Sequence, residues 1–249
     1  MGLFEFERTK SLIAKYLPAT SSCIIDVGGG TGKYSAWLAQ KEHKVHMVEP
    51  VDKHIKIALK RANKRGNKFH VHQGESRKLE FPNNFADLII LHGPLYHLQK
   101  KEDRELTVRE AKRVLKNNGI VLGFAINYTA STLAGLLNGL IHKKSLCKEE
   151  LTSGIHNPPL DFPWLLAEAY YHNPPQLEEE FLSQGFIHLN THAVEGMAWL
   201  DKNYFANMEN SERRKTLLEL IQLTEKDGNL LPFSPHMMIA IKKKSPYEK

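Results

Sequence analysis

The sequence predicts an α/β fold built on a largely parallel sheet, and three observations support this prediction. Short runs rich in β-branched residues alternate with helical patterns of roughly ten to fifteen residues through the first half of the chain. A glycine-rich turn joins the first run to the helical pattern that follows it. The chain has 249 residues, of which 41% are hydrophobic and 25% charged, and this excludes collagen-like and wholly disordered classes.

The first half of the chain contains the alternation. An amphipathic helix is expected over residues 3–17, with Pro18 as its stop. Strands and helices then alternate, which favours a parallel sheet covered on both faces. The run Asn117-Asn118-Gly119 is typical of a helix C-terminal cap. The expected strands are Ser22–Val27, Lys44–Val48, Phe69–His72, Ala86–Leu91 and Ile120–Ile126, and the expected helices are Gly32–Gln40, Asp52–Arg65 and Glu102–Lys116.

The alternation breaks after Ile126. Residues 127–172 contain two helical patterns, over 130–142 and 145–155, and we interpret this segment as an insertion within a single domain of residues 1–249. An insertion of this length is usually a lid or a substrate-binding element. Core elements are expected again as a helix over 175–184, a strand over 186–194, a helix over 211–226 and a last strand over 236–242.

The glycine-rich turn follows the first predicted strand. The spacing of its glycines distinguishes three classes of ligand-binding loop. A Walker A loop requires glycine where Val27 stands and serine or threonine where Tyr34 stands. A dinucleotide fingerprint requires a small residue where Lys33 stands. The spacing that fits is Asp-x-Gly-x-Gly-x-Gly, formed by Asp26, Gly28, Gly30 and Gly32.

This spacing resembles motif I of class I S-adenosylmethionine-dependent methyltransferases, and later segments resemble the family in the same order. Glu49 ends the second strand, where the family has an acid that accepts hydrogen bonds from the ribose hydroxyls. The segment Gln73-Gly74-Glu75-Ser76 is similar to the family's segment beside the adenine, with Glu and Ser in place of Asp and Ala. The string Gly-Pro-Leu-Tyr-His-Leu at residues 93–98 resembles a bacterial subgroup of the family.

The resemblance covers nearly the whole chain. It implies a Rossmann-like sheet of seven strands with the last strand antiparallel and a helical insertion after the fifth. It also implies S-adenosylmethionine as methyl donor, bound over the carboxyl ends of the strands, and S-adenosylhomocysteine as product. The residues that it implies around the cofactor are Asp26, Gly28, Gly29, Gly30, Gly32, Glu49, Glu75, Ser76 and His92.

Methyl transfer from a sulfonium is an in-line displacement, so the protein mainly has to align the reactants in a dry site. A base is needed only where the acceptor carries a proton that must leave. Tyr96 and His97 after the fourth strand, and His156 in the insertion, are the candidates for this chemistry; structural roles for these side chains are the alternative. We expect no metal site, because Cys23 and Cys147 are unrelated in spacing.

The sequence thus predicts a cytoplasmic enzyme that methylates a small molecule. No apolar run reaches membrane-spanning length, and the chain begins without an export signal. The formal net charge of +6 is modest, and no RNA-binding module is evident, so a nucleic-acid partner is not expected. Two alternatives stay open: an RNA or protein acceptor, and a non-catalytic cofactor-binding module that regulates a partner. The sequence does not indicate an oligomeric state.

Overall fold

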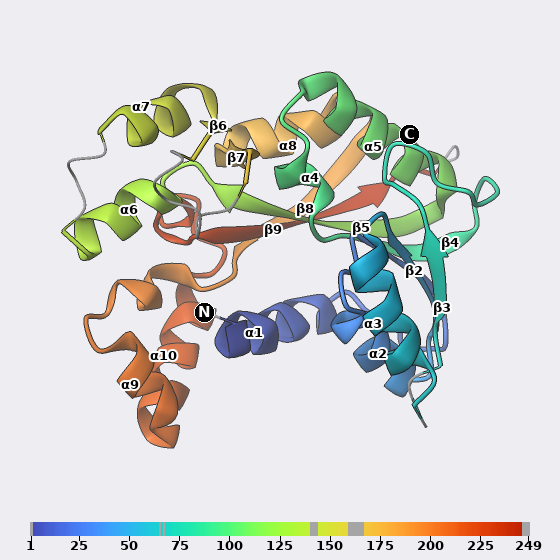
Figure 1. The fold of residues 1–249 in the computed structure, drawn as a ribbon, viewed down its shortest axis with the longest axis horizontal. Coiled ribbons are helices and arrows are strands. Elements are labelled where there is room, and N and C mark those ends of the chain that lie inside the picture. Colours follow the sequence, from blue (N-terminus) through green and yellow to red (C-terminus); the bar gives the residue numbers. More distant parts are fainter. Residues whose placement is uncertain (1, 65, 67, 140–143, 159–166, 246–249) are drawn as a thin grey trace. The chain divides into compact units, whose positions relative to one another are not determined.

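The strands that surround the glycine-rich turn are almost completely buried. The computed structural model describes residues 2–64, 66, 68–139, 144–158 and 167–245 (Figure 1). In β1 (Cys23–Val27), Ile24, Ile25 and Val27 are at most 1% exposed. Such strands are apolar on both faces because helices cover both sides of a parallel sheet. The residues 140–143 and 159–166 of the predicted insertion lie outside the described residues.

The sheet confirms the predicted topology. β1 pairs in parallel with β2 (Lys44–Glu49) and β4 (Ala86–Leu91), β2 with β3 (His70–Gln73), and β4 with β5 (Leu115–Asn127). β9 (His236–Lys243) pairs with β5 and with β8 (Phe186–Ala193). The core order is therefore β3-β2-β1-β4-β5-β9-β8, with antiparallel final strands, as expected for the class I methyltransferase fold.

Two compact units divide the chain, and the first contains the glycine-rich turn. It comprises residues 15–124, 178–189 and 239–249. Its strands are joined by α2 (Lys33–Gln40), α3 (Asp52–Ala62), the short α4 (Pro94–His97) and α5 (Lys101–Val114). α3 lies against β3 with α2 beside it (Figure 1). Arg104 of α5 forms a buried ion pair at 2.7 Å with Glu180 of α8 (Pro174–Leu182).

The second unit comprises residues 1–14, 125–177 and 190–238. Its helices are α1 (Gly2–Ala14), α6 (Ala130–Leu137), α7 (Lys144–Ser153), α9 (Tyr204–Glu209) and α10 (Ser211–Thr224), with 3₁₀ turns at Gly196–Leu200 and Leu231–Phe233. Phe4, Tyr204 and Ile221 form a small buried core in this unit. Arg8 adds a buried ion pair with Glu225 at 2.8 Å.

The predicted helix cap at residues 117–119 is wrong. α5 ends at Val114 and β5 begins at Leu115. The register between β4 and β5 shifts between Ala86 and Leu88, and Asn118 adopts a left-handed backbone with φ of 64°. Asn tolerates this conformation in bulges as well as in caps, so the same residue preference serves an irregular strand start here.

The insertion contains strands that the helical patterns did not predict. β6 (Ile155–His156) pairs antiparallel with β7 (Ala169–His172), and β7 pairs in parallel with the end of β5. The helix expected over 145–155 accordingly ends at Ser153. Among the described residues, none of the helices has both the length and the apolar character that a membrane span requires.

Candidate functional site

A cavity of about 440 Å³ opens at the carboxyl ends of β1, β2 and β4, within the first unit. Four segments line it: the glycine-rich turn, the end of β2 with the start of α3, the residues after β3, and the turn after β4. This is the edge of an α/β sheet at which ligands usually bind. Six of the predicted cofactor residues lie on its wall: Gly28, Gly30, Glu49, Glu75, Ser76 and His92.

Gly28 and Gly30 shape the wall formed by the glycine-rich turn. The Gly28 N–H donates to the carbonyl of Val48 at 2.8 Å, and its φ is +77°. A Cβ at Gly28 would lie 2.6 Å from the carbonyl oxygen of His92, so a side chain there would displace backbone. Around Gly30 no protein atom lies within 4 Å of the position of a Cβ. The turn therefore brings bare backbone to the cavity, which suits a closely approaching ligand.

Asp26, Gly29 and Gly32 do not line the cavity. Asp26 is fully buried behind Gly29, and its Oδ2 accepts a hydrogen bond from the Ser35 hydroxyl at 2.6 Å. Its Oδ1 has no hydrogen-bond partner among the residues described. Burial, reinforced by the charge of Glu49 and opposed by the Ser35 hydrogen bond, raises the pKa of Asp26 to about 6. These residues support the turn from behind.

Glu49 is held at the end of β2 by three donors and is 4% exposed. Its Oε2 accepts from the Gly30 N–H at 2.9 Å, and its Oε1 accepts from the Val51 N–H at 3.1 Å. The Nδ1 atom of His54 lies 3.2 Å from Oε1. A carboxylate offers about four acceptor positions, so Glu49 keeps capacity for a hydroxyl donor. The fixed acid and the bare backbone fit the adenosyl group of the expected cofactor.

Glu75 and Ser76 follow β3 on the same wall. The Ser76 hydroxyl is buried and lies 2.8 Å from the Thr107 hydroxyl. The Glu75 carboxylate is half exposed and accepts a hydrogen bond from Arg77 Nε at 3.0 Å. Ser76 is thus fixed in position, whereas the Glu75 carboxylate forms an ion pair with Arg77 at the surface.

Comparison with known proteins agrees with this geometry. Residues 24–119 match a family described as a methyltransferase domain. Over 117 residues the chain is 29% identical to the ubiquinone/menaquinone biosynthesis C-methyltransferase UbiE of Azotobacter vinelandii, an alignment that covers 45% of each chain. The chain therefore spans less than half the length of this curated relative. The matched segment, residues 24–119, is therefore similar to a methyltransferase domain.

Solved structures show the same fold over almost the whole chain. A SAM-dependent methyltransferase from Methanosarcina mazei matches with a TM-score of 0.66 at 16% identity, covering 94% of this chain and 97% of that one. An S-adenosylmethionine-dependent methyltransferase from Mesorhizobium loti matches with a TM-score of 0.63 at 12% identity, covering 97% and 99%. Identities this low show the shared fold alone.

The turn after β4 places three predicted side chains at the cavity: His92, Tyr96 and His97. The His92 ring stacks on Phe124 with centroids 4.4 Å apart and lies 4.9 Å from the ring of Tyr34. Partial burial lowers the pKa of His97, and the charge of Glu49 opposes that change. At neutral pH the His97 imidazole is therefore mostly uncharged and able to accept a proton.

His156 lies outside the cavity and belongs to the second unit. Its side chain is completely buried, its Nδ1 lies 2.5 Å from Glu150 Oε1, and its ring stacks on Tyr171 at 4.6 Å. A buried imidazole held on two sides is typical of a structural role. The structure thus brings Tyr96 and His97 together with the predicted cofactor residues, whereas His156 is not among the residues that line the cavity.

Sequence reasoning missed the side of the cavity formed by Pro50, Val51 and His54. These residues directly follow Glu49 and lead into the first turn of α3. The sequence could have indicated this side of the cavity. His54 follows the strand-ending Glu49 by five positions and therefore lies in the first turn of the next helix. The many basic residues from Lys53 onward instead favoured the interpretation of this segment as a solvent-exposed helix face.

Proposed function

We propose that the protein transfers the methyl group of S-adenosylmethionine to a small-molecule acceptor. The observation that supports this function best is the cavity at the strand ends, in which bare backbone at Gly28 and Gly30 faces the fixed carboxylate of Glu49. The relative from Azotobacter vinelandii is named as an enzyme of ubiquinone and menaquinone biosynthesis, which supports an acceptor of low molecular weight.

The chain's own residues supply binding and alignment. When bound, S-adenosylmethionine supplies an electrophilic methyl group. Glu49 accepts hydrogen bonds from a hydroxylated ligand, and its negative charge disfavours a phosphate at that place. His97, uncharged at neutral pH, is our candidate to take a proton from the acceptor, with Tyr96 beside it at a ring distance of 4.8 Å. Asp26 stabilises the glycine-rich turn and does not bind the reactants.

We also infer that the string at residues 93–98 defines the bacterial subgroup and contributes to acceptor choice. Support comes from its position, since five of its six residues line the cavity: Gly93, Pro94, Tyr96, His97 and Leu98. The insertion over residues 127–172, as part of a single domain of residues 1–249, stays our prediction for the lid or acceptor-binding element.

Calorimetric titration tests the cofactor. We expect S-adenosylmethionine and S-adenosylhomocysteine to bind, and ATP and NAD⁺ to bind far more weakly or not at all. Glu49→Gln should weaken binding by about tenfold, or about 1.4 kcal/mol, because a hydrogen bond to a charged acceptor is worth this much. Glu80→Gln removes an exposed carboxylate away from the cavity and should leave the affinity unchanged. Absence of binding, or preference for ATP or NAD⁺, would refute the proposal.

Transfer of labelled methyl from the cofactor into a cell extract tests the acceptor. Label in the small-molecule fraction supports the proposal. Label in the RNA or protein fraction would replace it with the corresponding macromolecular methyltransferase. Binding of the cofactor without transfer into any fraction would instead favour a non-catalytic module that regulates a partner.

A further inference from the structure

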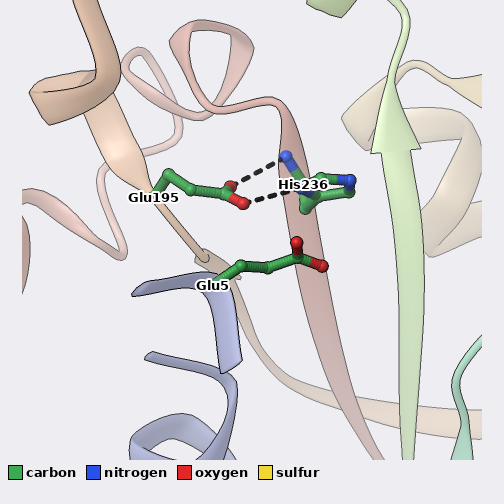
Figure 2. A group of neighbouring side chains, drawn as sticks. All are labelled: Glu5, Glu195 and His236. Atoms are coloured by element: carbon green, nitrogen blue, oxygen red, sulfur yellow. Dashed lines mark hydrogen bonds and ion pairs between the residues drawn. The ribbon is translucent and has the colours of Figure 1, made fainter. Parts of the chain in front are cut away.

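Three side chains from distant parts of the sequence meet within the second unit, and none of them lines the cofactor cavity (Figure 2). Glu5 comes from α1, Glu195 follows β8 directly, and His236 opens β9. Each residue offers one atom able to bind a metal ion, and these atoms all lie within 4.8 Å of one another. Among the residues that the structure describes, this is the group of three that meets that distance.

Glu195 is the fixed member of the group. It is fully buried, and its Oε1 lies 2.7 Å from the Nδ1 atom of His236. Its Oε2 accepts from the backbone N–H of His236 at 3.2 Å and from the Ser234 hydroxyl at 3.4 Å. Outer contacts of this kind orient the carboxylates that bind metal ions. Figure 2 shows the Glu5 carboxylate facing this pair without a hydrogen bond to either member.

Tyr204 provides a second, independent observation. Its residue surface is 5% exposed, and its hydroxyl has no hydrogen-bond partner in the described part of the chain. Its ring packs edge to face against Phe4, the residue that precedes Glu5 in α1, with the ring centroids 5.6 Å apart. Buried tyrosine hydroxyls usually find a partner, so this unpartnered oxygen near the start of α1 is a second feature that supports a ligand at the group.

We propose that Glu5, Glu195 and His236 bind a divalent first-row transition-metal ion. A divalent cation can bind at the two carboxylates when His236 gives up the proton that it donates to Glu195. The imidazole then favours Zn²⁺, Mn²⁺ or Fe²⁺ over Mg²⁺ or Ca²⁺. Zinc bonds of about 2.1 Å hold ligand atoms within roughly 4.2 Å of one another, so binding would draw the three side chains slightly closer than the 4.8 Å found here. The ion would link α1 to the end of β8 and the start of β9, and the Tyr204 hydroxyl would face it.

Zinc is the probe for the experiment. The full-length protein is freed of metal with EDTA, dialysed, and titrated with ZnCl₂ in a calorimeter, with metal analysis after equilibrium dialysis. We expect one zinc ion per chain and a higher melting temperature in its presence. Glu5→Gln should fold, since the Glu5 carboxylate makes no hydrogen bond within the group. It should weaken zinc binding on the order of tenfold or more and remove the thermal shift; Glu195→Gln provides a second variant.

The matched control is His70→Gln. His46, His70 and His72 form a separate group of stacked rings in the first unit, with His46 and His70 centroids 4.7 Å apart. Zinc binding should persist in this variant. Absence of zinc binding by the wild type, or unchanged affinity in both glutamate variants, would overturn the proposal. Loss of binding in His70→Gln alone would place the ion among the histidines and would overturn it as well. Because the measurement needs neither cofactor nor acceptor, its outcome is independent of the proposed methyl transfer.

Discussion

Replacing Asp26 with asparagine is expected to change how the stability of the protein depends on pH. In the wild type this carboxyl is fully buried on β1, accepts one hydrogen bond from Ser35 at 2.6 Å, and has an Oδ1 without a partner among the described residues. Burial and the charge of Glu49 raise its pKa from 3.8 to about 6. The folded protein therefore binds the Asp26 proton more tightly than the unfolded chain does.

The sign and size of the effect follow from this difference. The contribution of Asp26 to stability is greatest while the carboxyl is protonated in both the folded and the unfolded state. This contribution is lost as the pH rises from the unfolded pKa of 3.8 through the folded pKa of about 6. At 1.36 kcal/mol per pKa unit, the full loss is about 3 kcal/mol, of which about 2 kcal/mol falls between pH 4.5 and 8. Asparagine has no titrating proton. The free energy of unfolding of the variant should therefore rise relative to that of the wild type by about 2 kcal/mol between pH 4.5 and 8. Its buried amide adds a constant offset that does not change with pH.

Urea unfolding of both proteins at several pH values between 4.5 and 8 measures this difference. All other titrating groups are shared, so subtraction of the two curves isolates Asp26. Ser35→Ala serves as a second variant, because loss of the hydrogen bond that lowers the Asp26 pKa should move the wild-type stability loss to higher pH. A difference between wild type and Asp26→Asn that stays flat with pH, or that falls as the pH rises, would refute the reasoning.

Three further predictions concern the turn, a buried ion pair and the candidate base. Gly28→Ala should destabilise the protein more than Gly30→Ala in thermal unfolding, since its Cβ would lie 2.6 Å from a backbone oxygen whereas a Cβ at Gly30 meets nothing; the reverse order would contradict the geometry. Arg8→Met should cost about 3–5 kcal/mol in urea unfolding, because the buried Glu225 carboxylate loses its guanidinium partner at 2.8 Å and keeps His192 at 3.3 Å; a loss below about 1 kcal/mol would argue against a tight pair. With an acceptor in hand, His97→Gln should lower kcat/KM and leave the affinity for S-adenosylmethionine unchanged. It should also remove the acidic fall in rate, which lies below the ordinary imidazole range because burial lowers the pKa of His97; a retained acidic limb would exclude His97 as the base.

Local patterns predicted the fold well, because each core element carries its own signal. The run from Ala86 to Leu91 is the strand β4 with the predicted bounds, since its short length, its two isoleucines and the turn residues on either side favour a strand over a helix. The ends of elements were harder to predict. Asn118 illustrates the reason, because a preference for left-handed backbone does not say whether a helix ends or a strand bulges. β6 is only two residues long, and its pairing with β7 depends on residues distant in the sequence.

The candidate site shows a different limit. Neighbours in one motif need not face one ligand, since Asp26 is still in β1 whereas the positive φ of Gly28 and Gly30 turns the chain away from the strand. Gly28 and Gly30 form the cavity wall, while Asp26 contacts Ser35 behind the turn, although all three belong to a single spacing pattern. The pattern identifies the turn. Only the three-dimensional structure distinguishes the residues that line the cavity from those that stabilise the turn. This separation is why we expect Glu49→Gln to reduce cofactor affinity, whereas Asp26→Asn should be detected first through stability.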